Sequence, residues 1–169
     1  MFPKILVAID DSEFSRTIFE QALALAKTHH SELMIMHVLS LSDDIYPGDP
    51  YVGIPHAAFQ VYAKRWEDRK QTSLMQLRAL EAEAAAIGVL AEFTQNAGDP
   101  GKLICDAAKS WDANLIVIGR RGLSGLSELF MGSVSNYVLH HAPCHVLTIQ
   151  GVAQTVPPLE TARTVSGSV

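Results

Sequence analysis

Cysteines, basic clusters and long apolar runs are all scarce in this sequence of 169 residues, and each scarcity excludes a class of protein. The two cysteines, Cys105 and Cys144, lack motif spacing, which indicates a reducing compartment and not a disulfide scaffold. The formal net charge is −5 and no basic cluster is stronger than Arg120-Arg121, so we expect no nucleic-acid partner. No apolar run is long enough to span a bilayer and no signal-peptide core is present, so we expect a cytoplasmic protein without membrane contact.

The sequence does contain a regular alternation of short apolar runs and helical stripes. Apolar residues make up 48% of the chain and charged residues 18%, which is typical of a folded globular domain. Helical stripes separate the apolar runs, and the longest stripe extends from Ala63 to Ile87. This alternation predicts an α/β fold with three layers, α/β/α, around an open five-stranded parallel sheet. The predicted strands are residues 4–9, 32–39, 90–97, 115–118 and 145–149.

Two segments interrupt this alternation. Residues 40–62 carry three prolines and two glycines, and they predict a long loop that is functional, a lid or partly disordered. Residues 152–169 show no periodicity and predict a C-terminal tail that adds little to the core. We therefore expect one domain over residues 1–151, followed by the tail.

Polar residues and glycines mark the expected helix ends. Asp99 with Pro100 predicts the N-cap and first position of the third helix, and Gly88 predicts the end of the second. The pair Asp10-Asp11 also resembles the acidic pair that holds Mg²⁺ in a phosphoreceiver domain. The fifth strand lacks the lysine that such a domain requires, so we interpret Asp11 as a cap of the first helix.

Ligands of open parallel sheets bind beyond the carboxyl ends of the strands, near the point where the strand order reverses. Residues at four such ends are therefore candidates for binding. They are Asp10, the end of the second strand at Val38-Leu39, the turn from Ala97 to Pro100, and the stretch from Gly119 onward.

The last of these candidates is the run GRRGLSGLSELFMGSVSN, from Gly119 to Asn136. Glycine at 119 and 122 permits positive φ and a close approach of a ligand to the main chain. Gly132 and Ser133 begin the fourth helix, where unpaired N–H groups and the helix dipole favour an anion. This combination predicts a phosphate cradle, although spacing alone is equally compatible with ordinary loop glycines.

The motif spacing supplies the most specific signal in the sequence. Neither G-x-G-x-x-G nor G-x-x-x-x-G-K-[ST] is present, and the glycines instead form G-x2-G-x9-G-S from Gly119 to Ser133. With KILVAIDDS at the start, HV at the end of the second strand, G-x-P before the third helix and APCHVLTI at the end, the chain resembles the universal stress protein (UspA-like) family. The similarity covers roughly residues 1–150 and extends to the ATP-binding branch of the family.

The resemblance implies a Rossmann-like fold of the adenine-nucleotide alpha-hydrolase (HUP) type with ATP, ADP or AMP as its ligand. A divalent ion such as Mg²⁺ would be held mainly by the phosphates, with no protein ligands assigned. One of Arg120 and Arg121 could also reach a phosphate, although a solvated arginine pair is the commoner case. The implied nucleotide-binding residues are Ala8, Asp10, Val38, Gly119, Arg120, Gly122, Gly132, Ser133, Val134 and Ser135.

Several functions stay open at this point. The intact glycine motif favours a nucleotide-dependent stress-response regulator, with at most weak ATPase activity because no catalytic constellation is visible. The alternatives are a nucleotide-free homodimeric interaction module and a sensor of another adenosine nucleotide, such as AMP or a cyclic nucleotide. The resemblance also implies a homodimer through the last strand, residues 144–149, an edge that otherwise needs protection. The sequence predicts that Cys105 and Cys144 are packing residues and that His37 is a core or dimer-face residue and not a catalyst.

Overall fold

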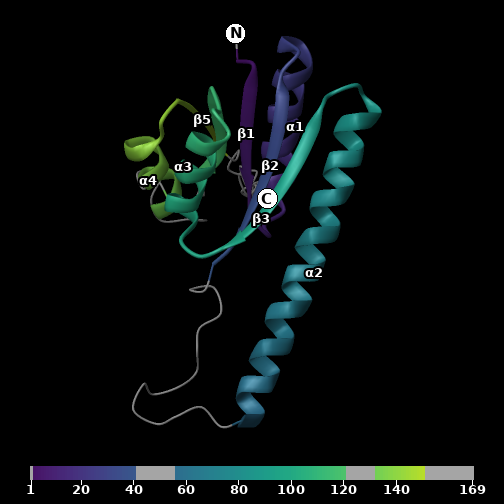
Figure 1. The fold of residues 1–169 in the computed structure, drawn as a ribbon, viewed down its shortest axis with the longest axis vertical. Coiled ribbons are helices and arrows are strands. Elements are labelled where there is room, and N and C mark those ends of the chain that lie inside the picture. Colours follow the sequence, from purple (N-terminus) through teal and green to yellow (C-terminus); the bar gives the residue numbers. More distant parts are fainter. Residues whose placement is uncertain (1, 41–55, 121–131, 151–169) are drawn as a thin grey trace, which may run out of the picture.

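The computed structural model describes residues 2–40, 56–120 and 132–150, in which strands and helices alternate along the chain (Figure 1). The predicted order of elements is confirmed. The elements are β1 (Lys4–Ile9), α1 (Phe14–His29), β2 (Glu32–Leu39), α2 (His56–Ala86), β3 (Ala91–Ala97), α3 (Pro100–Ser110), β4 (Leu115–Arg120), α4 (Ser133–His141) and β5 (His145–Gln150).

The strands form one open parallel sheet, as predicted, and their order is β3-β2-β1-β4-β5. β1 lies at the centre, where Val7 pairs with Ile35 of β2 on one side and with Val117 of β4 on the other. The chain moves outward from β1 to β3 and then returns to the far side of β1 to form β4. The strand order therefore reverses between β1 and β4, which places the expected ligand-binding edge there.

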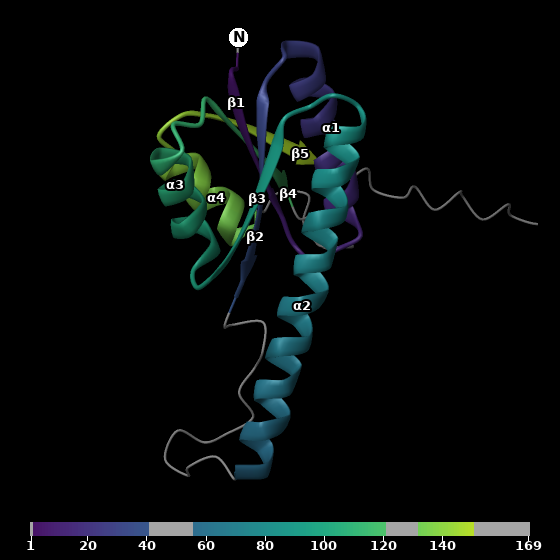
Figure 2. The same ribbon diagram turned by 45° about the vertical axis from the view of Figure 1, so that its right-hand side comes forward.

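Helices cover both faces of the sheet, and Figure 2 shows α1 and α2 on one side with α3 and α4 on the other. Alternate residues of each central strand enter the two resulting cores. Val7 and Ile35 pack with α1 and α2, whereas Leu6 and Met36 pack with α3 and α4. Burial on both faces explains why the central strands are continuous apolar runs and not alternating ones.

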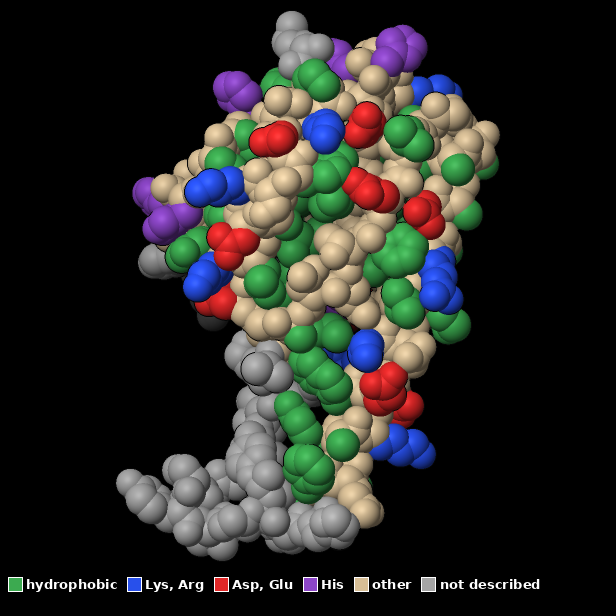
Figure 3. All heavy atoms as spheres, viewed as in Figure 1, with side chains coloured by type: hydrophobic (Ala, Val, Ile, Leu, Met, Phe, Trp, Pro, Cys, Tyr) green, Lys and Arg blue, Asp and Glu red, His purple; other side chains and the backbone are tan. Residues whose placement is uncertain are grey.

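Helix α2 begins at His56 and not at Ala63, so the predicted loop is shorter than residues 40–62. No proline or glycine occurs between Pro55 and Gly88, so nothing in this stretch stops a helix. The N-terminal half of α2 projects beyond the sheet (Figures 1 and 2), which removes the core contacts that give a helix its apolar stripe. Figure 3 shows hydrophobic side chains on the projecting half, where Phe59 and Val61 are exposed.

The helix-end predictions were partly correct. Asp99 caps α3 by accepting a hydrogen bond from the Lys102 amide at 3.0 Å, and Gly88 ends α2 with a φ of 81°. Ile87, the last residue of the expected helical stripe, lies just beyond the end of α2 at Ala86 and is exposed. The prediction that Asp11 caps α1 is wrong, because the N-cap is Glu13 and no side chain caps this helix.

Candidate functional site

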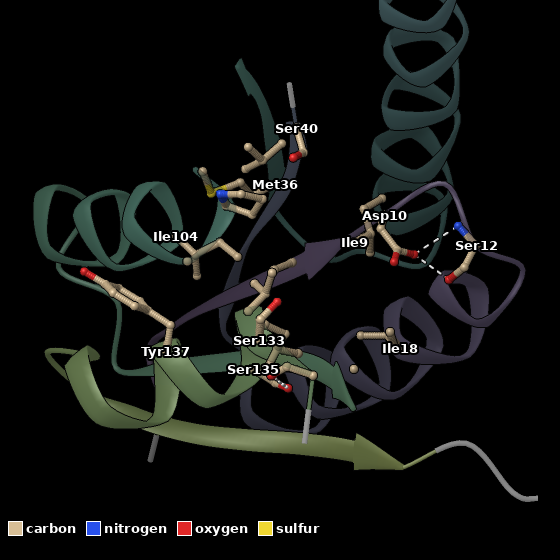
Figure 4. A pocket seen from close by; sticks show the side chains of 18 of the residues that line it. Ile9, Asp10, Ser12, Ile18, Met36, Ser40, Ile104, Ser133, Ser135 and Tyr137 are labelled. Atoms are coloured by element: carbon tan, nitrogen blue, oxygen red, sulfur yellow. Dashed lines mark hydrogen bonds between the residues drawn. The ribbon is translucent and has the colours of Figure 1, made fainter. Parts of the chain in front are cut away.

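A pocket of about 490 Å³ lies at the carboxyl edge of the sheet, where the strand order reverses (Figure 4). The ends of β1, β2 and β4 form its floor, and the first turns of α3 and α4 form its wall on one side. Its size is within the range of pockets that hold small molecules and cofactors. All four candidate regions of the sequence contribute to it, through Asp10, Val38, Asp99 and Gly119.

Eight of the ten expected nucleotide-binding residues line this one pocket. Arg120 ends β4 and is not among the described lining residues, and Gly122 lies outside the described residues. Arg121 and the rest of the glycine run up to Met131 also lie outside them, as do residues 41–55 and the tail. The lining residues from the expected set are Ala8, Asp10, Val38, Gly119, Gly132, Ser133, Val134 and Ser135.

The carboxylate of Asp10 is fixed by the turn that follows β1. Its Oδ1 accepts hydrogen bonds from the Ser12 amide at 3.0 Å, from the Ser15 hydroxyl at 2.8 Å and from the Ser12 hydroxyl. The Asp10 amide in turn donates to Ser15 Oγ at 2.8 Å, and Ser15 is buried. Asp10 therefore organises its own loop at the pocket wall (Figure 4), whereas Asp11 is not among the described lining residues and contacts His37 instead.

Helix α4 presents its N-terminus to the pocket. Gly132 is the N-cap, and the first amide to bond back along the helix is that of Asn136, which donates to the Gly132 carbonyl at 2.9 Å. The first-turn amides before Asn136 have no intrahelical acceptor, so this end of the helix suits an anion. Ser135 is buried and its hydroxyl donates to the Gly132 carbonyl at 3.0 Å, whereas Ser133 is exposed.

Two glycines of the pocket have packing roles that the sequence analysis missed. A Cβ on Gly119 would lie 2.3 Å from Ile18 Cδ1, so this glycine allows β4 to approach α1. A Cβ on Gly101 would lie 2.8 Å from Tyr137 Cδ1, so this glycine lets α3 pack against α4. Among the described glycines, positive φ occurs at Gly88 and Gly98 and not at Gly119. Of the two reasons expected for glycine at 119, positive φ is therefore wrong, and room for the close approach of a ligand stays a prediction.

The remaining wall of the pocket is largely apolar. Met36, Ile104 and Tyr137 come from β2, α3 and α4, and none of them was expected at the site. Ligands bind at the carboxyl edge of such sheets, and the first turn of α3 lies at that edge. This rule is the signal that could have identified Gly101 and Ile104 as lining residues. No comparable local signal marks Tyr137, whose ring stacks on His141 with 4.0 Å between ring centroids.

The charges around the pocket have one sign. Asp10 and Asp99 are acidic, and no Lys, Arg or His is among the described residues that line it. An anion at α4 would therefore depend on main-chain N–H groups and the helix dipole. In the described part of the chain, no three His, Cys, Asp or Glu side chains lie close enough together to hold a metal ion.

The two cysteines lie outside the pocket and are free thiols. Burial raises the pKa of the Cys105 thiol, and burial likewise raises the pKa of the Cys144 thiol, so neither is an activated nucleophile. Both pack in the core beneath α3 and α4, as predicted. His37 is buried as well.

Among the described helices, none has the length and apolar composition needed to cross a bilayer.

The sheet order, the layers and the position of the pocket define a doubly wound α/β domain with a ligand site at its topological switch point. Comparison with known proteins then identifies the family. The model of the universal stress protein family matches residues 1–150, and the chain belongs to this family.

Two relatives are similar to this chain along nearly their whole length. Universal stress protein Sll1388 of Synechocystis sp. is 39% identical over 153 residues, which cover 88% of this chain and 98% of that protein. The structure of universal stress protein UspA from Lactobacillus plantarum has a TM-score of 0.69 at 24% identity, over 86% of this chain and 96% of that one.

Two further solved structures carry a ligand. A universal stress protein family protein from Arabidopsis thaliana, with AMP bound, has a TM-score of 0.60 at 25% identity, over 92% of this chain and 96% of that one. A universal stress protein in complex with cAMP has a TM-score of 0.59 at 21% identity, over 88% of this chain and 97% of that one. The cAMP complex supports the fold alone.

Proposed function

We propose that this chain binds an adenine nucleotide, with ATP as the principal ligand, and acts as a nucleotide-dependent regulator of a stress response. The observation that carries the proposal is one pocket that joins the Asp10 carboxylate to the N-terminus of α4. A carboxylate suits the hydroxyls of a ribose or the amine of a base, and a helix N-terminus suits phosphate. The Arabidopsis relative with AMP bound supports the same assignment.

In this proposal the adenosine end lies against Ala8, Asp10 and Val38, and the phosphates lie at residues 132–135. Mg²⁺ accompanies the triphosphate and is held by phosphate oxygens and water, which is the coordination that Mg²⁺ prefers. The described lining residues offer no basic side chain that would stabilise a leaving phosphate. We therefore expect any hydrolysis of ATP to be slow, and we propose that the bound state itself is the signal.

The test is to identify and then to titrate the ligand. Mass spectrometry of the small molecules released when the freshly purified protein is denatured is expected to detect an adenine nucleotide. Added ATP or AMP is expected to raise the melting temperature, since a ligand at 100 times its Kd stabilises the native state by about 2.7 kcal/mol. GTP is the control. No shift with ATP, ADP, AMP or cAMP would favour the nucleotide-free interaction module.

The two serines of the first turn of α4 are expected to differ in their effects. Ser133→Ala removes an exposed hydroxyl proposed to bond a phosphate, and we expect ATP affinity to fall about three- to tenfold. Ser135→Ala removes a buried hydroxyl that bonds the Gly132 carbonyl, so it is expected to cost about 1 kcal/mol of stability and to leave affinity nearly unchanged. Calorimetric titration and thermal melts of both variants separate the two roles, and equal losses of affinity would contradict the assignment.

We also propose that the protein forms a homodimer through β5. This strand pairs only with β4 among the described strands, and it carries Leu147, which is 36% exposed. An unprotected edge with an exposed apolar residue favours pairing with a second copy.

A charge on this edge tests the dimer. We expect Leu147→Lys to convert a dimer to a monomer in light scattering after gel filtration, because lysine on an edge strand opposes pairing. The matched control is Leu90→Lys, a more exposed leucine beside the opposite edge strand β3. An unchanged mass for Leu147→Lys, or monomers with both variants, would overturn the proposed interface.

A further inference from the structure

A polar cluster joins the pocket loop to helix α2 on the face of the sheet opposite α3 and α4. His37 Nε2 lies 2.9 Å from Asp11 Oδ1, and Arg69 Nη2 of α2 donates to Asp11 Oδ2 at 3.1 Å. Next to His37 in the sheet, Gln95 donates to Ser73 Oγ of α2 at 2.6 Å. At the carboxyl edge, where α2 begins to project beyond the sheet, these polar contacts take the place of apolar packing between α2 and the sheet.

His37 holds Asp11 through a single, defined hydrogen bond. The side chain is 2% exposed, and its Nδ1 is buried with no hydrogen-bond partner in the described part of the chain. A proton on Nδ1 would be a buried donor without an acceptor, so we assign the proton to Nε2, which donates to the Asp11 carboxylate. His37 is thus a buried donor committed to Asp11, and the carboxylate has a second donor in Arg69.

Asp11 directly follows Asp10, and their side chains have different partners. Asp10 lines the pocket and is bonded to Ser12 and Ser15, whereas Asp11 bonds β2 and α2. The two residues share one planar peptide unit, so a shift of Asp11 also moves the main chain of Asp10. The loop is therefore held at one end by its contact with α1 and, on the side away from the pocket, by His37 and Arg69.

We infer that Asp11 is a positioning residue for the nucleotide site and that His37 and Arg69 act through it to fix the Asp10 carboxylate at the pocket wall. The inference rests on the proposed function for its ligand. The same contacts also connect the site to the part of α2 where its projecting half begins. A role in stability alone would require only that α2 stay attached to the sheet, and it would leave the affinity of folded protein unchanged.

The experiment compares four variants by calorimetric titration with AMP. Asp11→Ala and His37→Leu are expected to weaken AMP binding about tenfold, the equivalent of one lost charge-assisted contact at the site. His37→Gln keeps an N–H donor near the position of Nε2 and is expected to stay within about twofold of the unmodified chain. The control is Arg16→Met, which removes a salt bridge of 2.6 Å from α1 to Glu83 of α2 without touching Asp11.

Amide hydrogen exchange followed by NMR supplies a readout that needs no ligand. The Asp10 and Ser12 amides are bonded to Ser15 Oγ and Asp10 Oδ1, so their exchange is expected to quicken several-fold in Asp11→Ala and His37→Leu, and not in Arg16→Met. Unchanged affinity in Asp11→Ala despite a lower melting temperature would overturn the inference, as would an equal loss in Arg16→Met. If the unmodified chain does not bind AMP or ATP, the proposed function fails. The exchange rates at Asp10 and Ser12 then still decide whether Asp11 positions the loop, and unchanged rates reject it.

Discussion

Replacing Gly101 by alanine is expected to lower the free energy of unfolding by about 2 kcal/mol, the size of a typical overpacking defect. The added Cβ would lie 2.8 Å from Tyr137 Cδ1 and 3.0 Å from Tyr137 Cβ. The Tyr137 ring is 37% exposed, so it can move away from the new Cβ only by losing its stacking on His141, to which its plane is inclined by 12°. Alanine gains up to about 1 kcal/mol over glycine in helix interiors, but Gly101 lies in the first turn of α3, where the gain is smaller.

The same substitution is expected to weaken nucleotide binding about tenfold or more. Gly101 and Tyr137 both line the pocket, so separating α3 from α4 moves the helix that presents its N-terminus to the phosphates. Chemical denaturation and calorimetric titration measure the two effects. The partner variant is Tyr137→Ser, which removes the ring that the new Cβ would meet. In that background only the 3.0 Å contact with the Cβ at position 137 remains, so Gly101→Ala is expected to cost clearly less than in the unmodified chain, and additive losses in the double variant would show that the ring is not the cause.

The open parallel sheet and the pocket edge were predictable because they depend on local patterns and general rules. Burial on both faces makes β1, β2 and β4 continuous apolar runs. A helix between consecutive strands returns the chain to the same end of the sheet, so the strands run parallel. The position of the pocket then follows from the reversal of strand order. Asp10, Val38 and Gly119 could therefore be placed at one site from the sequence before their contacts were known.

The features that the sequence did not predict depend on contacts between distant segments. Asp11 has the sequence context of a helix cap, yet His37 and Arg69, far along the chain, compete for its carboxylate. Tyr137 and Gly101 belong to different helices, so no periodicity links them. The early start of α2 was missed for a related reason, because its first turns have no sheet to pack against and show no apolar stripe.

Gly119 offers the sharpest distinction between packing and ligand approach as the reason for a glycine in the motif. We expect Gly119→Ala to cost about 1 kcal/mol of stability, because its Cβ would overlap Ile18 Cδ1, the flexible end of a buried side chain that can turn toward the pocket it lines. Ile18→Val removes that terminal methyl and by itself costs about 1 kcal/mol. The double variant is therefore expected to be more stable than the sum of the two single losses, with a coupling energy of about 1 kcal/mol.

Nucleotide affinity decides which role of Gly119 matters. The added Cβ points toward α1, where its next neighbours would be Ile18 Cγ1 and Phe14 Cε1, each at 3.3 Å. If packing against α1 is the reason for glycine, ATP affinity falls in Gly119→Ala through displacement of β4 and returns to within about threefold in the double variant. If the ligand itself requires the space, affinity stays low in the double variant although stability recovers. We expect the first result, because the nearest atoms to the missing side chain belong to α1 and because φ at Gly119 is not positive.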